Sequence, residues 1–184
     1  CDIQPTDIPG NHYQGDVFDI LYQGWDMLIA FPPCTYISYV ANRHWNAPGR
    51  AELRQDAVQF FLGLAHAPIP HIALENPVGY MNTIWRSPDQ IIHPYYFGEP
   101  FQKRTCLWLK NLPLLDYRQT IIPKPEPLYI CRGEKSKGKA INWVEGIKGS
   151  GAERAEARSR TFPLVADAMA RAWSEPSGYQ TGLF

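Results

Sequence analysis

The chain has 184 residues, of which 45% are hydrophobic and 20% are charged, so it is long enough for one domain with a sizeable core. Its 18 basic and 18 acidic residues cancel, which excludes a global field that steers the whole chain toward nucleic acid or a membrane surface. No apolar run approaches the roughly 18 residues of a membrane span, and no secretory signal pattern is present. The four cysteines lack CxxC spacing, which indicates free thiols rather than disulfides or a metal site. These features predict a cytoplasmic protein without a membrane partner.

The N-terminal part of the chain combines a loop, a short apolar segment and one buried strand. The first residues resemble the end of a strand, and the following residues up to 15 are typical of turns. We therefore expect the first strand of the sheet to be missing from this chain. Residues 16–21 are apolar at alternate positions, as in a short strand. Residues 27–31 form an apolar run that predicts a buried strand.

Two prolines and a cysteine follow this buried strand. Pro32 and Pro33 fix their own φ and donate no backbone hydrogen bond, so they end the strand. We therefore expect Cys34 on a stiff turn at the carboxyl end of a strand, where open α/β sheets bind ligands. A thiol in that place suits chemistry, and the alternative interpretation is a small buried side chain in a turn.

The rest of the chain alternates helices with strands. The predicted elements are, in chain order, a helix opened by Pro48 with apolar spacing up to Leu64, a buried strand over 69–74, a strand over 105–109, a long basic loop rich in proline and glycine over 119–160, and a helix from Phe162 to Trp173. This alternation predicts a single α/β domain over residues 1–184, with a mostly parallel central sheet flanked by helices.

Glu75 and Asn76 directly follow the second predicted strand. A carboxylate there is not needed for packing, because burying it is unfavourable unless it is paired. Cys34 supplies a nucleophile as thiolate, and Glu75 can hold or protonate a ring nitrogen. Together they suit thiolate addition to an electron-poor ring, with an acid that neutralises the developing charge. The alternative for Glu75 is a carboxylate that caps the following turn.

The chemistry-bearing motifs of the chain occur in a particular order. They are Asp2, Gly15-Asp16-Val17, Phe31-Pro32-Pro33-Cys34, Glu75-Asn76-Pro77, and Phe97-Gly98-Glu99-Pro100 with Lys103 and Arg104. This order resembles that of the DNA cytosine-5 methyltransferases, and it is most similar to their short phage and prophage members. The resemblance covers residues 1–110, and the segment 158–163 with its helix is similar to their C-terminal ending. It implies a Rossmann-like methyltransferase fold and an enzyme that transfers a methyl group from S-adenosyl-L-methionine to DNA.

The resemblance also implies catalytic roles for individual residues. Cys34 would add to C6 of cytosine, and Glu75 would contact N3 and the amino group. Asn76 would shape the turn that follows. Arg104, or its neighbour Lys103, would be the basic residue of the site.

The same resemblance implies a cofactor site. Asp2 and Asp16 would contact the ribose hydroxyls and the adenine amino group of S-adenosyl-L-methionine. Their neighbours in the motifs are assigned to the same cofactor: Ile3, Val17, Phe31 and Pro32.

The implied substrate is a cytosine flipped out of duplex DNA, since a base inside the stack cannot reach Cys34. Arg43, His44 and Trp45 lie just after the cysteine loop, where a mobile lid over such a base would sit, and an ordinary hydrogen-bonded loop is the alternative. Two other functions remain open. One is a methyltransferase of the same fold that modifies free nucleotides or an exocyclic amine. The other is a catalytically silent relative that binds nucleic acid. The sequence leaves the target sequence and the oligomeric state undetermined.

Overall fold

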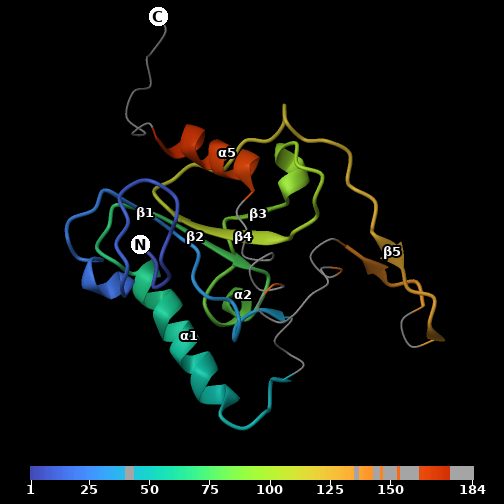
Figure 1. Cartoon of the computed structure of the whole chain (residues 1–184), viewed down its shortest axis with the longest axis horizontal. Helices are drawn as coiled ribbons and strands as arrows, with labels where there is room; N and C mark the ends of the chain where they lie inside the picture. The colour runs from blue at the N-terminus through green and yellow to red at the C-terminus, as the bar shows by residue number, and fades with distance from the viewer. Residues whose placement is uncertain (40–43, 135–136, 143–145, 147–152, 154–161, 175–184) are drawn as a thin grey trace, which may run out of the picture. The chain divides into compact units, whose positions relative to one another are not determined.

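The computed structural model describes residues 1–39, 44–134, 137–142, 146, 153 and 162–174 (Figure 1). The chain divides into two compact units. The first comprises Cys1–Pro88 and Leu107–Leu112, and the second comprises Asp89–Cys106 and Pro113–Phe184. The prediction of a single domain over the whole chain stays a prediction.

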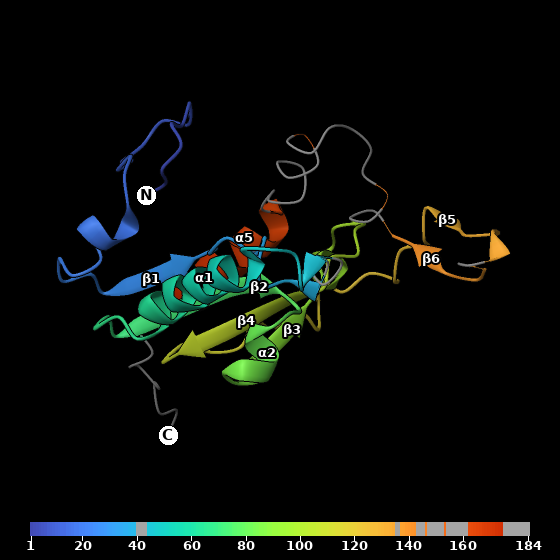
Figure 2. The ribbon, with the colours of Figure 1, turned by 90° about the horizontal axis from the view of Figure 1, so that it is seen from below.

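A mixed sheet of four strands forms the centre of this α/β fold. Its strands lie in the order β1-β2-β4-β3. Their bounds are β1 Met27–Ala30, β2 His71–Pro77, β3 Gln90–Ile92 and β4 Thr105–Lys110. β1 and β2 are parallel, with Met27 opposite His71 and Ala30 opposite Leu74. Figure 2 shows the β4 arrow running opposite to β1.

The predicted mostly parallel order is wrong, because the sheet is mostly antiparallel. The helix content of the connections is consistent with the difference. A parallel crossover takes a dozen or more residues and usually a helix, which α1 supplies between β1 and β2. The segment 93–104 between β3 and β4 contains only the short helix η3, which suits an antiparallel return.

The structure confirms the two long predicted helices, α1 and α5, and contains short helices as well. They are η1 Val17–Asp19, α1 Arg50–Ala65, α2 Met81–Ile84, η3 Pro94–Phe97 and α5 Pro163–Trp173. The strand expected over 16–21 is wrong, since that segment contains η1. Its cause is local: the Asp16 carboxylate accepts the backbone N–H of Phe18 at 2.9 Å and caps the turn.

The long basic segment contains a small hairpin. β5 Tyr129–Ile130 pairs antiparallel with β6 Ala140–Ile141. A loop over 119–160 is therefore only a partial description, and much of 143–160 lies outside the described residues.

The core of the first unit lies between α1 and the sheet. Phe61 of α1 packs edge-on against Trp108 of β4, with ring centroids 5.2 Å apart, and both side chains are at most 1% exposed. Ile72 and Leu74 of β2 are equally buried. Aromatic side chains of this size contribute much of the hydrophobic stabilisation of a domain, so α1 is fixed firmly on the sheet.

The core of the second unit forms around α5. Val165, Met169 and Trp173 of this helix are buried, at helical spacing. The indole N–H of Trp173 donates to the Pro113 carbonyl at 2.9 Å. At the other end, the Glu99 carboxylate accepts the backbone N–H of Leu164 at 2.8 Å, a favourable place for a negative charge.

Candidate active site at the ends of strands β1 and β2

Cys34 lies on a turn that directly follows β1. Its carbonyl oxygen accepts hydrogen bonds from the backbone N–H groups of Ile37, at 3.2 Å, and Ser38, at 2.9 Å. The cysteine side chain is half-buried, while Pro32 before it is buried and Phe31 is 51% exposed. β1 ends at Ala30, one residue earlier than predicted. The structure thus confirms a turn with a partly accessible thiol at the carboxyl end of a strand.

Asn76 connects this turn to strand β2. Its side chain is 2% exposed, and its amide nitrogen donates to the Pro32 carbonyl at 2.7 Å and to the Glu75 carbonyl at 3.1 Å. A buried amide must find such partners, because an unpaired polar group in the interior is unfavourable. The bond therefore fixes the Pro32–Cys34 turn against the end of β2, which carries Glu75.

Glu75 lies inside β2 rather than after it. The predicted strand over 69–74 begins at His71 and continues to Pro77, so the expected boundary before Glu75 is wrong. Pro77 can end a strand without loss, since a terminal residue need not donate to the ladder. The Glu75 side chain is half-buried.

The loops that follow the two strands also pair with each other. Ser38 and Gly79 form an antiparallel bridge, and the backbone N–H of Tyr80 donates to the Ile37 carbonyl at 2.6 Å. The approach is so close that a Cβ on Gly79 would lie 2.2 Å from the Ile37 carbonyl oxygen. Only glycine fits there without displacing backbone. The first unit therefore brings the Cys34 and Glu75 segments together through the Asn76–Pro32 hydrogen bond and the Ser38–Gly79 backbone bridge.

The predicted cofactor residues near the N-terminus lie beside one another. Asp2 forms an isolated parallel bridge with Gln14, and the Asp2 carbonyl accepts the N–H of Gly15 at 3.1 Å. Asp16, Val17 and Ile3 therefore belong to the same small region as Asp2, and Ile3 is exposed.

The chemistry of these carboxylates fits a ligand with hydroxyl or amine donors. One oxygen of Asp2 accepts the N–H of Gln4 at 2.8 Å, and one oxygen of Asp16 accepts the N–H of Phe18. A carboxylate has about four acceptor sites, so each group keeps further capacity. Both side chains are exposed to solvent.

Arg104 belongs to the second unit, so its expected contribution to the site of Cys34 stays a prediction. Arg104 is exposed, and its charge affects the pKa of His93 in the same unit. Burial lowers the pKa of His93 below 6.5, and the charges of Arg104 and Lys124 lower it further. Lys103 lies over the Phe162 ring at 5.9 Å.

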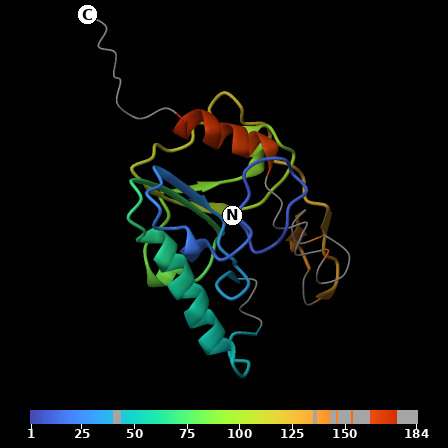
Figure 3. The ribbon, with the colours of Figure 1, turned by 60° about the vertical axis from the view of Figure 1, so that its left-hand side comes forward.

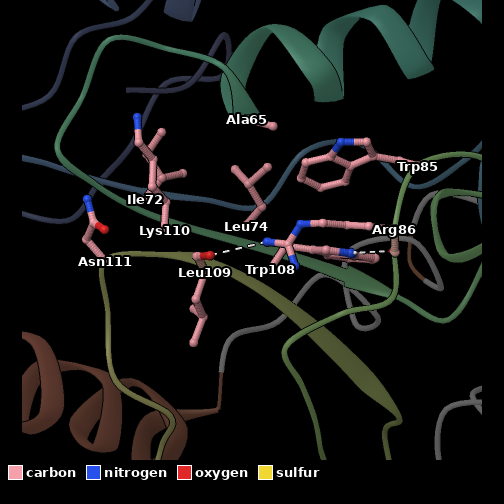
Figure 4. A pocket seen from close by; sticks show the side chains of 9 residues that line it. All are labelled: Ala65, Ile72, Leu74, Trp85, Arg86, Trp108, Leu109, Lys110 and Asn111. Atoms are coloured by element: carbon pink, nitrogen blue, oxygen red, sulfur yellow. Dashed lines mark hydrogen bonds between the residues drawn. The ribbon is translucent and has the colours of Figure 1, made fainter.

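A pocket of about 380 Å³ lies in the first unit, and none of the predicted site residues lines it (Figure 4). Its lining is Ala65, Ile72, Leu74, Trp85, Arg86, Trp108, Leu109, Lys110 and Asn111. Arg86 donates to the Leu109 carbonyl at 3.2 Å and lies over the Trp85 ring at 4.8 Å. Asn111 donates to the Pro70 carbonyl, which places this rim beside the start of β2 rather than its Glu75 end. No spacing pattern in the sequence marks these residues as a group.

The comparisons with known proteins add no assignment: no protein-family model, curated protein or solved structure matches the chain. Within the described ranges, no helix has the length and apolar character needed to cross a bilayer. In the same ranges, no three histidine, cysteine or acidic residues gather as metal ligands.

Proposed function

We propose that this chain carries the nucleophile of a DNA cytosine-5 methyltransferase and uses Cys34 to activate a flipped cytosine. The observation that supports this most is the buried hydrogen bond from Asn76 to Pro32, which holds the cysteine turn against the strand of Glu75. The placement of a nucleophile and an acid on two adjacent, fastened segments supports covalent catalysis as the mechanism. The proposal includes a Rossmann-like fold, in which the parallel β1–β2 pair carries the site.

The proposed reaction begins when the Cys34 thiolate forms a bond to C6 of cytosine. Glu75 donates a hydrogen bond or a proton at N3, so the electron pair pushed into the ring is stabilised there. C5 becomes nucleophilic and forms a bond to the methyl group, whose bond to the sulfonium donor would break and leave a thioether. C5 then loses its proton to solvent, any proton on N3 returns to Glu75, the bond from sulfur to C6 breaks, and the thiolate leaves a 5-methylcytosine.

S-adenosyl-L-methionine would supply the electrophilic methyl group from its sulfonium centre. Asp2 and Asp16 are the carboxylates with capacity to accept its hydroxyl and amino donors, and the exposed Phe31 ring offers an apolar surface beside Pro32. The role proposed for these residues is to bind that donor.

Methyl transfer with position analysis tests the function. The full-length protein is incubated with methyl-labelled S-adenosyl-L-methionine and, in separate reactions, duplex DNA, single-stranded DNA and free cytidine nucleotides. Label on C5 of DNA cytosine supports the proposal. Label on an exocyclic amine, or on free nucleotides only, supports the other methyltransferase reading. DNA binding without any transfer supports a catalytically silent relative.

A further inference from the structure

Two arginines at the start of α1 contact the segment that follows Cys34. The guanidinium of Arg50 lies over the Tyr36 ring, 4.4 Å from its centroid, and donates to the Thr35 carbonyl at 3.0 Å. Thr35 is the residue directly after Cys34. Arg54 lies one turn further along the same helix, and residues 44–49 lead into that helix (Figure 3).

Arg54 makes a closer and more extensive set of contacts. Its guanidinium lies 3.6 Å from the centroid of the Trp45 ring and 5.7 Å from that of Tyr80, and it donates to the Trp45 carbonyl at 3.2 Å. The two rings also meet each other edge-on, with centroids 4.9 Å apart. All three side chains are half-buried, which strengthens a cation–π contact relative to one in open solvent.

This cluster joins the two segments of the proposed site. Tyr80 directly follows Gly79, whose backbone pairs with Ser38, and it belongs to the loop after Glu75. Trp45 belongs to the segment after Cys34. On α1, Arg54 therefore contacts the loop after Glu75 and the segment that leads into the helix, and Arg50 contacts Thr35 beside Cys34. α1 itself is anchored on the sheet through Phe61.

We propose that Arg54 is a positioning residue, which fixes the Cys34 turn relative to the Glu75 strand by holding Trp45 and Tyr80 on α1, the helix whose Arg50 contacts Thr35 beside Cys34. This inference rests on the proposed function, in which Cys34 is the nucleophile. The role needs arginine, because only a planar guanidinium stacks on a ring and donates to a carbonyl in the same geometry. Lysine keeps the charge and loses that arrangement.

Alkylation of the cysteines tests the proposal without any need for methyl transfer. The full-length protein and its Arg54→Lys variant are treated with iodoacetamide over a range of pH, and each modified cysteine is quantified by peptide mass spectrometry. A loosened turn exposes the half-buried thiol more often, so we expect Cys34 to react about fivefold faster in the variant, in line with the strength of a partly buried cation–π contact. The pH series separates accessibility from ionisation of the thiol.

Cys106 is the internal reference, since its side chain is 0% exposed. Faster reaction of Cys34 with Cys106 still protected supports the positioning role. An unchanged Cys34 rate overturns it, and so does a rate increase shared by Cys106, which would indicate general destabilisation. Arg118→Lys is the matched control, because Arg118 makes an exposed ion pair with Asp116 in the other unit.

A second variant removes the ring on which the guanidinium lies. Trp45→Leu should raise the Cys34 rate to a similar extent, and the double variant with Arg54→Lys should add little, since both changes disrupt one interaction. Fully multiplicative effects contradict the proposal. In methyl transfer, Arg54→Lys should lower kcat with little change in the KM for DNA. If the unmodified protein transfers no methyl group while the alkylation result holds, the proposed function fails and the positioning of Cys34 stands.

Discussion

The side-chain amide of Asn76 donates a 2.7 Å hydrogen bond to the carbonyl oxygen of Pro32, two residues before Cys34. This bond joins residues 44 positions apart in the chain. It is buried, so water does not compete for either group. Asn76 thereby acts as a structural connection between the two strand ends of the candidate site.

Replacing Asn76 with alanine should loosen this connection. The change leaves the buried Pro32 carbonyl without its donor, which lowers the free energy of unfolding by about 1–3 kcal/mol. Urea denaturation followed by circular dichroism measures the effect. Asn46→Ala, at an exposed position, is the control and should leave the midpoint unchanged. Equal midpoints for the two variants would contradict the role of Asn76.

A methyl group on Gly79 should separate the two loops. In Gly79→Ala the new Cβ meets the Ile37 carbonyl oxygen and the Ser38 Cα, 2.8 Å away, so backbone has to move. We expect a loss of about 1–3 kcal/mol in stability together with faster alkylation of Cys34, as in Arg54→Lys. Gly63→Ala is a matched control in α1, since its Cβ meets only the outer end of the Phe18 ring. A variant of Gly79 as stable as that of Gly63 would argue against close loop contact.

Glu75 should matter for chemistry more than for folding. Glu75→Gln keeps the shape of the side chain and removes its ability to hold a charge or deliver a proton. The rate of methyl transfer should fall by about 100-fold or more, with little change in thermal midpoint. Glu52→Gln, at an exposed position in the first turn of α1, should retain full activity. Full activity of the Glu75 variant would remove this residue from the proposed reaction.

The charge of Arg104 should be detectable at His93. Burial is the main cause of the lowered pKa of His93, and Arg104 adds to it, so Arg104→Gln should raise that pKa partway toward 6.5. A lowered folded-state pKa means that stability is full above 6.5 and is lost as pH falls through the folded value. The variant should therefore lose less stability in acid. NMR titration of His93 checks the shift. Lys103→Gln is the control, and an equal effect of both variants would contradict the assignment.

Local patterns were sufficient to predict several elements of the fold. The apolar run 27–31 and the spacing of α1 and α5 predicted the positions of these elements, because burial of one face dominates their formation. The alternation over 16–21 predicted a strand, yet the Asp16 cap formed η1 instead. A side chain that satisfies a nearby backbone N–H can override a weak hydrophobic pattern.

The sequence predicts which residues form the candidate site, but it predicts only part of the contacts that hold them together. Pro32-Pro33-Cys34 indicated a stiff turn, and the parallel β1–β2 pair brings it to the Glu75 end of β2. The extension of β2 through Pro77 was missed because Asn76 and Pro77 look like turn residues. β2 extends to Pro77 because Asn76 hydrogen-bonds to Pro32, which is far away in sequence. The contact of Arg54 with Tyr80, which is also distant in sequence, is not predictable for the same reason.

The most direct test of the central claim is a trapping reaction with DNA that contains 5-fluorocytosine. The fluorine at C5 cannot leave as a proton does, so the bond from sulfur to C6 persists after methyl transfer. With S-adenosyl-L-methionine present, we predict an adduct that survives denaturing electrophoresis, persists in Cys131→Ser and disappears in Cys34→Ser. Absence of any adduct with the full-length protein, or an adduct that survives Cys34→Ser, would contradict Cys34 as the nucleophile.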